Sequence, residues 1–139
     1  MKNITIILLL VLSSFVMKAQ TITIKLENKS EMNNKQEIVK NSKLTNASFL
    51  AYIKTDKAGQ DYLEFYPTNI EIGIKGRYDL VSTSKNNSTG VILFNLANKY
   101  EKQIQLALHM KNGLGFITYN VSNDGKYYKN VVGGKYTMK

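Results

Sequence analysis

Apolar and polar residues alternate with a period of two through most of this chain, and this pattern constrains its fold more than any other feature. In 21–26 and 103–110, every second residue is Ile, Leu or Met; along 70–80, most apolar residues hold even positions and most charged ones hold odd positions. Such alternation places one set of side chains on one face of an extended strand. Polar turn sequences separate the runs about every ten residues, a spacing typical of a β-sandwich or small barrel of about eight or nine strands.

Two segments depart from this alternation. Residues 28–45 are rich in Asn and Lys, and they leave two interpretations open, a loop or one short helix around Glu31–Lys40. Only three apolar residues would give such a helix an apolar side, so its amphipathic pattern is weak. Near the C-terminus, the pair Gly133-Gly134 predicts a break in the last strand.

The first residues read as a targeting segment. Lys2 precedes an apolar run at Ile4–Leu12, and small residues follow up to Ala19. This is the pattern of a secretory signal peptide, and the apolar run is too short for a membrane span. The sequence therefore predicts a signal peptide at 1–19 and one β-sandwich domain at 20–139. We expect the protein to be exported, to the periplasm or beyond it, without a membrane anchor.

The composition narrows the kinds of partner. The chain has no cysteine, so disulfide and thiol chemistry are excluded. Without Lys2 and Lys18, 17 basic residues face 10 acidic ones, a net charge of +7. This charge indicates an acidic partner, whether an anionic polymer, a lipid surface or a protein, although a lysine-rich solvated surface explains it equally well. Arg77 is the only arginine, which argues against nucleic acid.

Catalytic and metal-binding residue types are scarce. His109 is the only histidine, and it has neither a cysteine nor a nucleophile motif to accompany it. Asp56, Asp61 and Asp124 flank turns, where aspartate is common for backbone reasons alone. We therefore expect no metal, no cofactor and no enzymatic activity, with a glycosidase-type carboxylate pair as a minor alternative.

The first candidate site is a basic face. Lys75 and Arg77 share odd parity and so project from the same side of a strand, and Lys85 in the following loop extends the basic surface. We expect these three residues to bind a partner. The alternative is that the cations only protect an edge strand from aggregation.

The second candidate site is aromatic. Tyr127, Tyr128 and Tyr136 lie among lysines near the C-terminus. A tyrosine ring with its polar hydroxyl suits a sugar-binding or adhesive surface. Cross-strand aromatic packing explains the same residues without a ligand.

Five stretches repeat the strand-and-turn order of a known family. They are Gly59–Pro67, Arg77–Leu80, Ser88–Gly90, Phe94–Ala97 and Thr118–Gly125. In these stretches the chain resembles the small periplasmic curli-accessory proteins. Some members of that family carry a Cys-x-Cys pair on the strand that is occupied here by Ile74-Lys75-Gly76, and this chain has none.

The resemblance implies both a fold and a role. Proteins of that family are immunoglobulin-like sandwiches that keep a curli amyloid subunit from polymerising early. We therefore expect an all-β, antiparallel immunoglobulin-like β-sandwich of about eight strands. The leading hypothesis for function is a non-enzymatic periplasmic accessory protein that binds an acidic amyloid subunit. The second is a secreted adhesion or carbohydrate-binding module.

Overall fold

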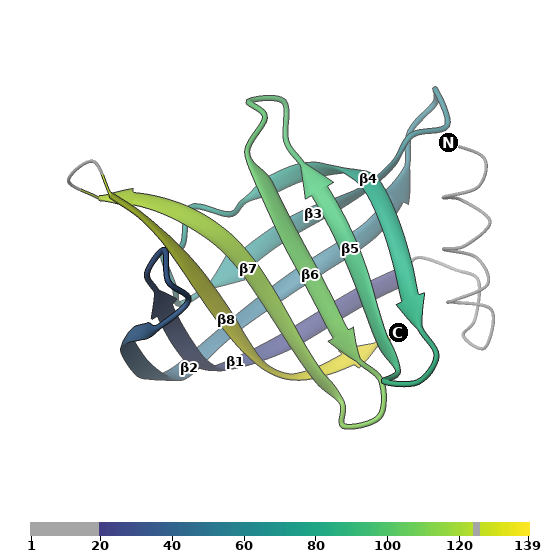
Figure 1. The fold of residues 1–139 in the computed structure, drawn as a ribbon. Coiled ribbons are helices and arrows are strands. Elements are labelled where there is room, and N and C mark those ends of the chain that lie inside the picture. The colour runs from purple at the N-terminus through teal and green to yellow at the C-terminus, as the bar shows by residue number, and fades with distance from the viewer. Residues whose placement is uncertain (1–19, 124–125) are drawn as a thin grey trace.

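The computed structural model describes residues 20–123 and 126–139 (Figure 1). The predicted signal peptide, residues 1–19, lies outside this part of the chain. The strands are β1 (Gln20–Met32), β2 (Ile38–Thr55), β3 (Asp61–Thr68), β4 (Gly76–Asn86), β5 (Val91–Ala97), β6 (Gln103–His109), β7 (Leu114–Asn123) and β8 (Lys126–Met138). No helix among the described residues is long and apolar enough to cross a membrane.

The strands form one closed barrel. Each strand pairs antiparallel with the next along the chain, and β8 pairs with β1 to complete the ring (Figure 1). The all-β prediction is confirmed, but the expected immunoglobulin-like sandwich is wrong. A sandwich keeps two separate sheets, whereas here the first and last strands hydrogen-bond to each other. Alternation specifies one buried face per strand in both architectures, so it does not distinguish them.

Two glycines let β8 lie close to its two neighbouring strands, Gly134 to β1 and Gly133 to β7. A Cβ on Gly134 would overlap the carbonyl oxygen of Lys25, and a Cβ on Gly133 would overlap the ring of Phe116. The β1–β8 register shifts between Ile24 and Asn28, where this close approach occurs. The predicted break at Gly133-Gly134 is therefore wrong, because β8 runs through both residues without interruption.

Residues 28–45 are neither a loop nor a helix. They form the outer part of the β1–β2 hairpin, in which Glu31 pairs with Lys40. The turn is closed by Asn33, whose Oδ1 accepts hydrogen bonds from the backbone N–H groups of Lys35 and Glu37 at 2.9 and 3.0 Å. Residues 28–32 pair with β2 on one side and with β8 on the other. These hydrogen-bonded pairs stabilise the hairpin although its apolar pattern is weak.

The barrel interior is filled by side chains, as is common for barrels of eight strands. Phe65 lies in its middle, with ring centroids 5.2 Å from Phe49 and 5.6 Å from Tyr78. The inward face predicted for 70–80 is confirmed at Ile72, Ile74, Tyr78 and Leu80, all buried. The strand itself begins only at Gly76, so 70–75 reaches the core as a loop.

Candidate functional site: a cleft beside the start of β4

A cleft of about 520 Å³ opens on the surface beside the start of β4. One wall is formed by the end of the β3–β4 loop and the first residues of β4, and the other by the β5–β6 turn. The lining residues are Lys75, Gly76, Arg77, Asp79, Asn98, Lys99 and Tyr100. Its volume lies within the range of about 300–1,000 Å³ that ligand sites occupy.

The strand register explains why the barrel wall is open here. Gly76 to Asp79 pair with β3, but pairing of β4 with β5 begins only at Asp79, opposite Ala97. Residues 76–78 therefore have a strand neighbour on one side only. In the described part of the chain, no backbone hydrogen bond joins 76–78 to the turn at 98–102. The start of β4 is a short local strand edge inside a closed barrel.

The opposite wall is an ordered turn. Asn98 Oδ1 accepts hydrogen bonds from the backbone N–H groups of Tyr100 and Lys102 at 3.0 and 2.9 Å. Lys102 Nζ donates to the carbonyl oxygen of Gly73 at 2.9 Å, which ties this turn to the β3–β4 loop. The turn presents Tyr100 to solvent with 76% of its surface exposed, and Lys99 Nζ lies 5.0 Å from the centre of that ring.

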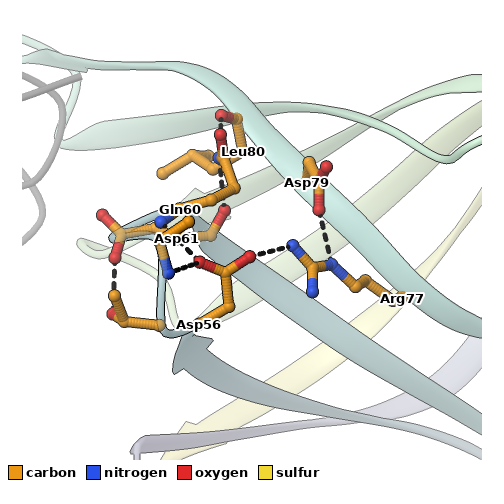
Figure 2. A network of polar contacts seen from close by, with 8 residues as sticks. Asp56, Gln60, Asp61, Arg77, Asp79 and Leu80 are labelled. Atoms are coloured by element: carbon orange, nitrogen blue, oxygen red, sulfur yellow. Dashed lines mark hydrogen bonds and ion pairs between the residues drawn. The ribbon is translucent and has the colours of Figure 1, made fainter.

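Arg77 is held in a network of polar contacts (Figure 2). Its guanidinium donates from Nη2 to Asp56 Oδ2 and from Nε to Asp79 Oδ1, both at 2.7 Å, and it lies 4.0 Å over the ring of Tyr62. The hydrogen bond from Arg77 is the main cause that lowers the pKa of Asp56, and the two aspartates raise the pKa of Arg77. The arginine charge is thus shared with two carboxylates rather than free.

The network also fixes the position of the β2–β3 turn. Asp56 Oδ1 accepts hydrogen bonds from the N–H groups of Ala58 and Gln60, both at 2.9 Å. Gln60 Nε2 donates to the carbonyl oxygen of Leu80 at 3.1 Å (Figure 2). The turn is therefore attached to β4 by side chains as well as by the strand ladder, and Arg77 is anchored over β3.

The two lysines that line the cleft, Lys75 and Lys99, are not compensated by a carboxylate of the described residues. Both are exposed and line the cleft from opposite walls. Across residues 20–123 and 126–139, no ion pair with a carboxylate is found for either lysine. Lys75 is one of the residues predicted from the sequence. Lys99 and Tyr100 are not, because the sequence of a polar turn does not indicate which other segment the turn faces.

Lys85 does not belong to this cleft. It lies eight residues after Arg77 on β4, about 26 Å away at roughly 3.3 Å per residue, and pairs with Ile92 near the β4–β5 turn. The basic face predicted from the sequence is therefore two separate places on the barrel. A hairpin turn follows Lys85, and in it Asn86 Oδ1 accepts a hydrogen bond from the N–H of Ser88 at 2.9 Å.

The predicted aromatic surface is also divided. Tyr136 packs against the core, and burial raises the pKa of its phenol. Tyr128 is half-buried and lies eight residues away, lining a small pocket with Met32 at the other end of β8. The side chain of Tyr127 lies outside the described part of the structure. The packing interpretation fits Tyr136 best.

Catalytic and metal groups do not gather around the cleft. The described residues contain no group of three or more His, Asp or Glu side chains that could hold a metal ion. His109 packs its ring against Phe116, with centroids 5.2 Å apart. Comparisons with protein-family models, with curated proteins and with solved structures find no match to this chain.

Proposed function

We propose that the protein is a non-enzymatic binding protein whose cleft takes an acidic segment of a partner protein. The observation that carries the proposal is the pair of uncompensated ammonium groups, Lys75 and Lys99, on facing walls of a cleft of about 520 Å³. Tyr100 lines the same cleft and, being 76% exposed, offers apolar contact area through its ring. Carboxylates on an incoming segment can approach both lysines without displacing an existing ion pair.

Arg77 has a positioning role in this proposal. Its two ion pairs and its stacking on Tyr62 hold the guanidinium over β3, and they compensate the carboxylate of Asp79 inside the cleft. An acidic ligand would otherwise be repelled by that carboxylate. The net charge of +9 over the whole chain favours the same class of partner, because it accelerates the approach of an acidic protein.

The narrower role, restraint of a curli-type amyloid subunit, remains a proposal that rests on the sequence resemblance. The immunoglobulin-like fold that the resemblance implied is not the fold of this chain. What supports the role is the charge of the cleft and its position beside a strand edge. If a curli-type subunit keeps the same fibrillation lag when the protein is added below stoichiometric amounts, this narrower proposal is wrong.

Binding of an acidic peptide tests the general proposal. We expect a fluorescent peptide that alternates Glu with Val and Thr to bind the wild-type protein in low salt, measured by fluorescence anisotropy. Changing Lys75 and Lys99 to Glu should weaken binding about tenfold or more, equivalent to about 1.4 kcal/mol. A matched control changes Lys85 and Lys57, two other exposed lysines outside the cleft, to Glu. If both double variants lose the same affinity for the peptide, binding depends on the net charge of the protein and not on the cleft.

A carbohydrate ligand is the second candidate, favoured by the surroundings of Tyr100. This exposed ring lies in one cleft with the polar groups of Asn98 and Asp79. An open aromatic face beside amide and carboxylate groups suits a sugar ring. Glycan binding that is lost on changing Tyr100 to Ala but kept in the Lys75 and Lys99 variant would favour this candidate over the acidic segment.

A further inference from the structure

We propose that the cleft recognises its partner by strand addition: an extended acidic segment pairs through its backbone with the free edge of β4 at residues 76–78. This inference rests on the proposed function and states how the same site binds. Strand addition takes its affinity from main-chain hydrogen bonds and its specificity from alternate side chains.

The backbone at this edge is available. Residues 76–78 have β3 on one side and, because β5 ends at Ala97, no strand on the other. Beyond Ala97 the chain leaves the strand ladder and forms the β5–β6 turn, ordered by the hydrogen bonds to Asn98 Oδ1, which is the opposite wall of the cleft. Unpaired N–H and C=O groups along a strand are a ready template for another chain.

Space beside the edge is also open. Gly76 lines the cleft, and a Cβ built on it would meet nothing within 4 Å. A partner backbone can therefore come close to this residue. Arg77 lines the cleft, but its guanidinium is held by the carboxylate of Asp56 (Figure 2) and over the ring of Tyr62.

The side chains around the edge select for alternating acidic residues. Lys75 is exposed on the same parity as Arg77, whereas Ile74 and Tyr78 point into the core. Successive residues of an added strand also point to opposite faces. Acidic residues at every second position would therefore face solvent and the ammonium groups of Lys75 and Lys99. The residues between them would face the barrel.

Strand addition would give the proposed partner binding a physical consequence. A segment whose backbone is paired with β4 cannot use the same edge to pair with a copy of itself. Growth of cross-β assemblies requires such pairing along every chain. A protein that occupies an acidic strand in this way would restrain its self-assembly while bound.

Backbone-methylated peptides test this inference separately from charge. An extended peptide has two edges, and N-methylation of alternate amides blocks one edge and leaves the other intact. The acidic peptide that alternates Glu with Val and Thr is made with eight residues and in two further versions, methylated on the odd or on the even residues, which have the same charge and composition as each other. We expect one version to lose at least about tenfold in affinity relative to the unmethylated peptide while the other keeps it, because strand addition uses one edge.

The outcomes separate this inference from the proposed function. If the unmethylated and both methylated peptides bind equally and the Lys75 and Lys99 variant still weakens them, strand addition is wrong and the cleft binds by side chains alone. If no acidic peptide binds the wild-type protein at low salt, the proposed function fails and the inference fails with it. If only one methylated peptide loses affinity, and the Lys75 and Lys99 variant also binds the unmethylated peptide more weakly, both the strand addition and the proposed function are supported.

Discussion

Strand pairing closes the barrel between β1 and β8, but β4 and β5 are not paired at residues 76–78. At the seam between β1 and β8, pairing runs from Ile22 to Met32 with one register shift between Ile24 and Asn28, where Gly134 lets the backbones approach more closely than any side chain would permit. At the start of β4, pairing with β3 covers four residues, Gly76 to Asp79, and pairing with β5 begins only at the last of them. Gly134 thus allows the barrel to close between β1 and β8, and the end of β5 at Ala97 leaves it open beside the start of β4.

The difference shows where this fold can place a site. Side chains between β1 and β8 pack against neighbouring strands, so a substitution there changes the free energy of unfolding. Side chains around the opening are Lys, Asn and Tyr with exposed surfaces, so substitutions there can change binding while the barrel stays folded. The following predictions test that contrast.

The largest effect is expected at the seam. Changing Gly134 to Ala places a Cβ onto the carbonyl oxygen of Lys25, so the strands must separate locally. We expect the free energy of unfolding to fall by about 3 kcal/mol, measured by urea denaturation. Gly113→Ala is the control, because its φ of 70° is unfavourable for alanine but nothing lies within 4 Å. It should cost about 1–2 kcal/mol. A Gly134→Ala cost no larger than the control's would contradict the close approach of β8 to β1.

The next effect concerns the wall of the opening. Changing Asn98 to Ala removes the acceptor of two backbone N–H groups in the β5–β6 turn. We expect a loss of about 1 kcal/mol of stability together with weaker binding of the acidic peptide. Asn33→Ala is a matched control, because Asn33 accepts two backbone N–H groups in the same way in the β1–β2 turn. It should cost similar stability and leave peptide binding unchanged. Equal binding by the two variants would mean that the turn does not shape the cleft.

A smaller effect, in pH dependence, is expected from the ion pair that anchors Arg77. The pKa of Asp56 is lowered in the folded protein, first by its hydrogen bond from Arg77. A lowered folded-state pKa stabilises the protein above the unfolded pKa of 3.8, and this stability is lost as the pH falls through the folded pKa. Unfolding measured from pH 7 to pH 2.5 should show a smaller acid loss in Asp56→Asn than in wild type. Parallel curves for the two proteins would contradict the role of this pair.

The smallest stability effect is expected for Tyr100, which is 76% exposed. Changing it to Ala should alter the free energy of unfolding by less than about 0.5 kcal/mol and still weaken ligand binding at the cleft. A large loss of stability with unchanged binding would make Tyr100 a structural residue and remove it from the site.

The alternation of the sequence was sufficient to predict the inward faces, because burial of one face fixes the parity of each strand. It placed Ile72, Tyr78 and Leu80 in the core correctly. Closure could not be predicted the same way. Gly133-Gly134 has the composition of a strand break, and its actual role depends on Lys25 and Phe116, which are distant in the sequence.

The candidate site was predicted only in part, for the same physical reason. Lys75 and Arg77 could be found from parity, because both lie on one local segment. The pairing of Arg77 with Asp56 and the position of Lys99 across the cleft depend on which turns the barrel brings together. Lys85 is predicted in the loop that follows the strand, but β4 continues to Asn86 and carries Lys85 away from the cleft.

Amide hydrogen exchange of residues 76–78, followed by NMR with and without the acidic peptide, tests the central claim most directly. In the free protein, we expect fast exchange for amides that face the missing strand and slow exchange for β1–β8 amides such as those of Ile24 and Val132. Adding the peptide should slow exchange at 76–78 and leave the seam unchanged. Slow exchange at 76–78 in the free protein, or no change on adding a peptide that binds, would contradict the open edge and its use in recognition.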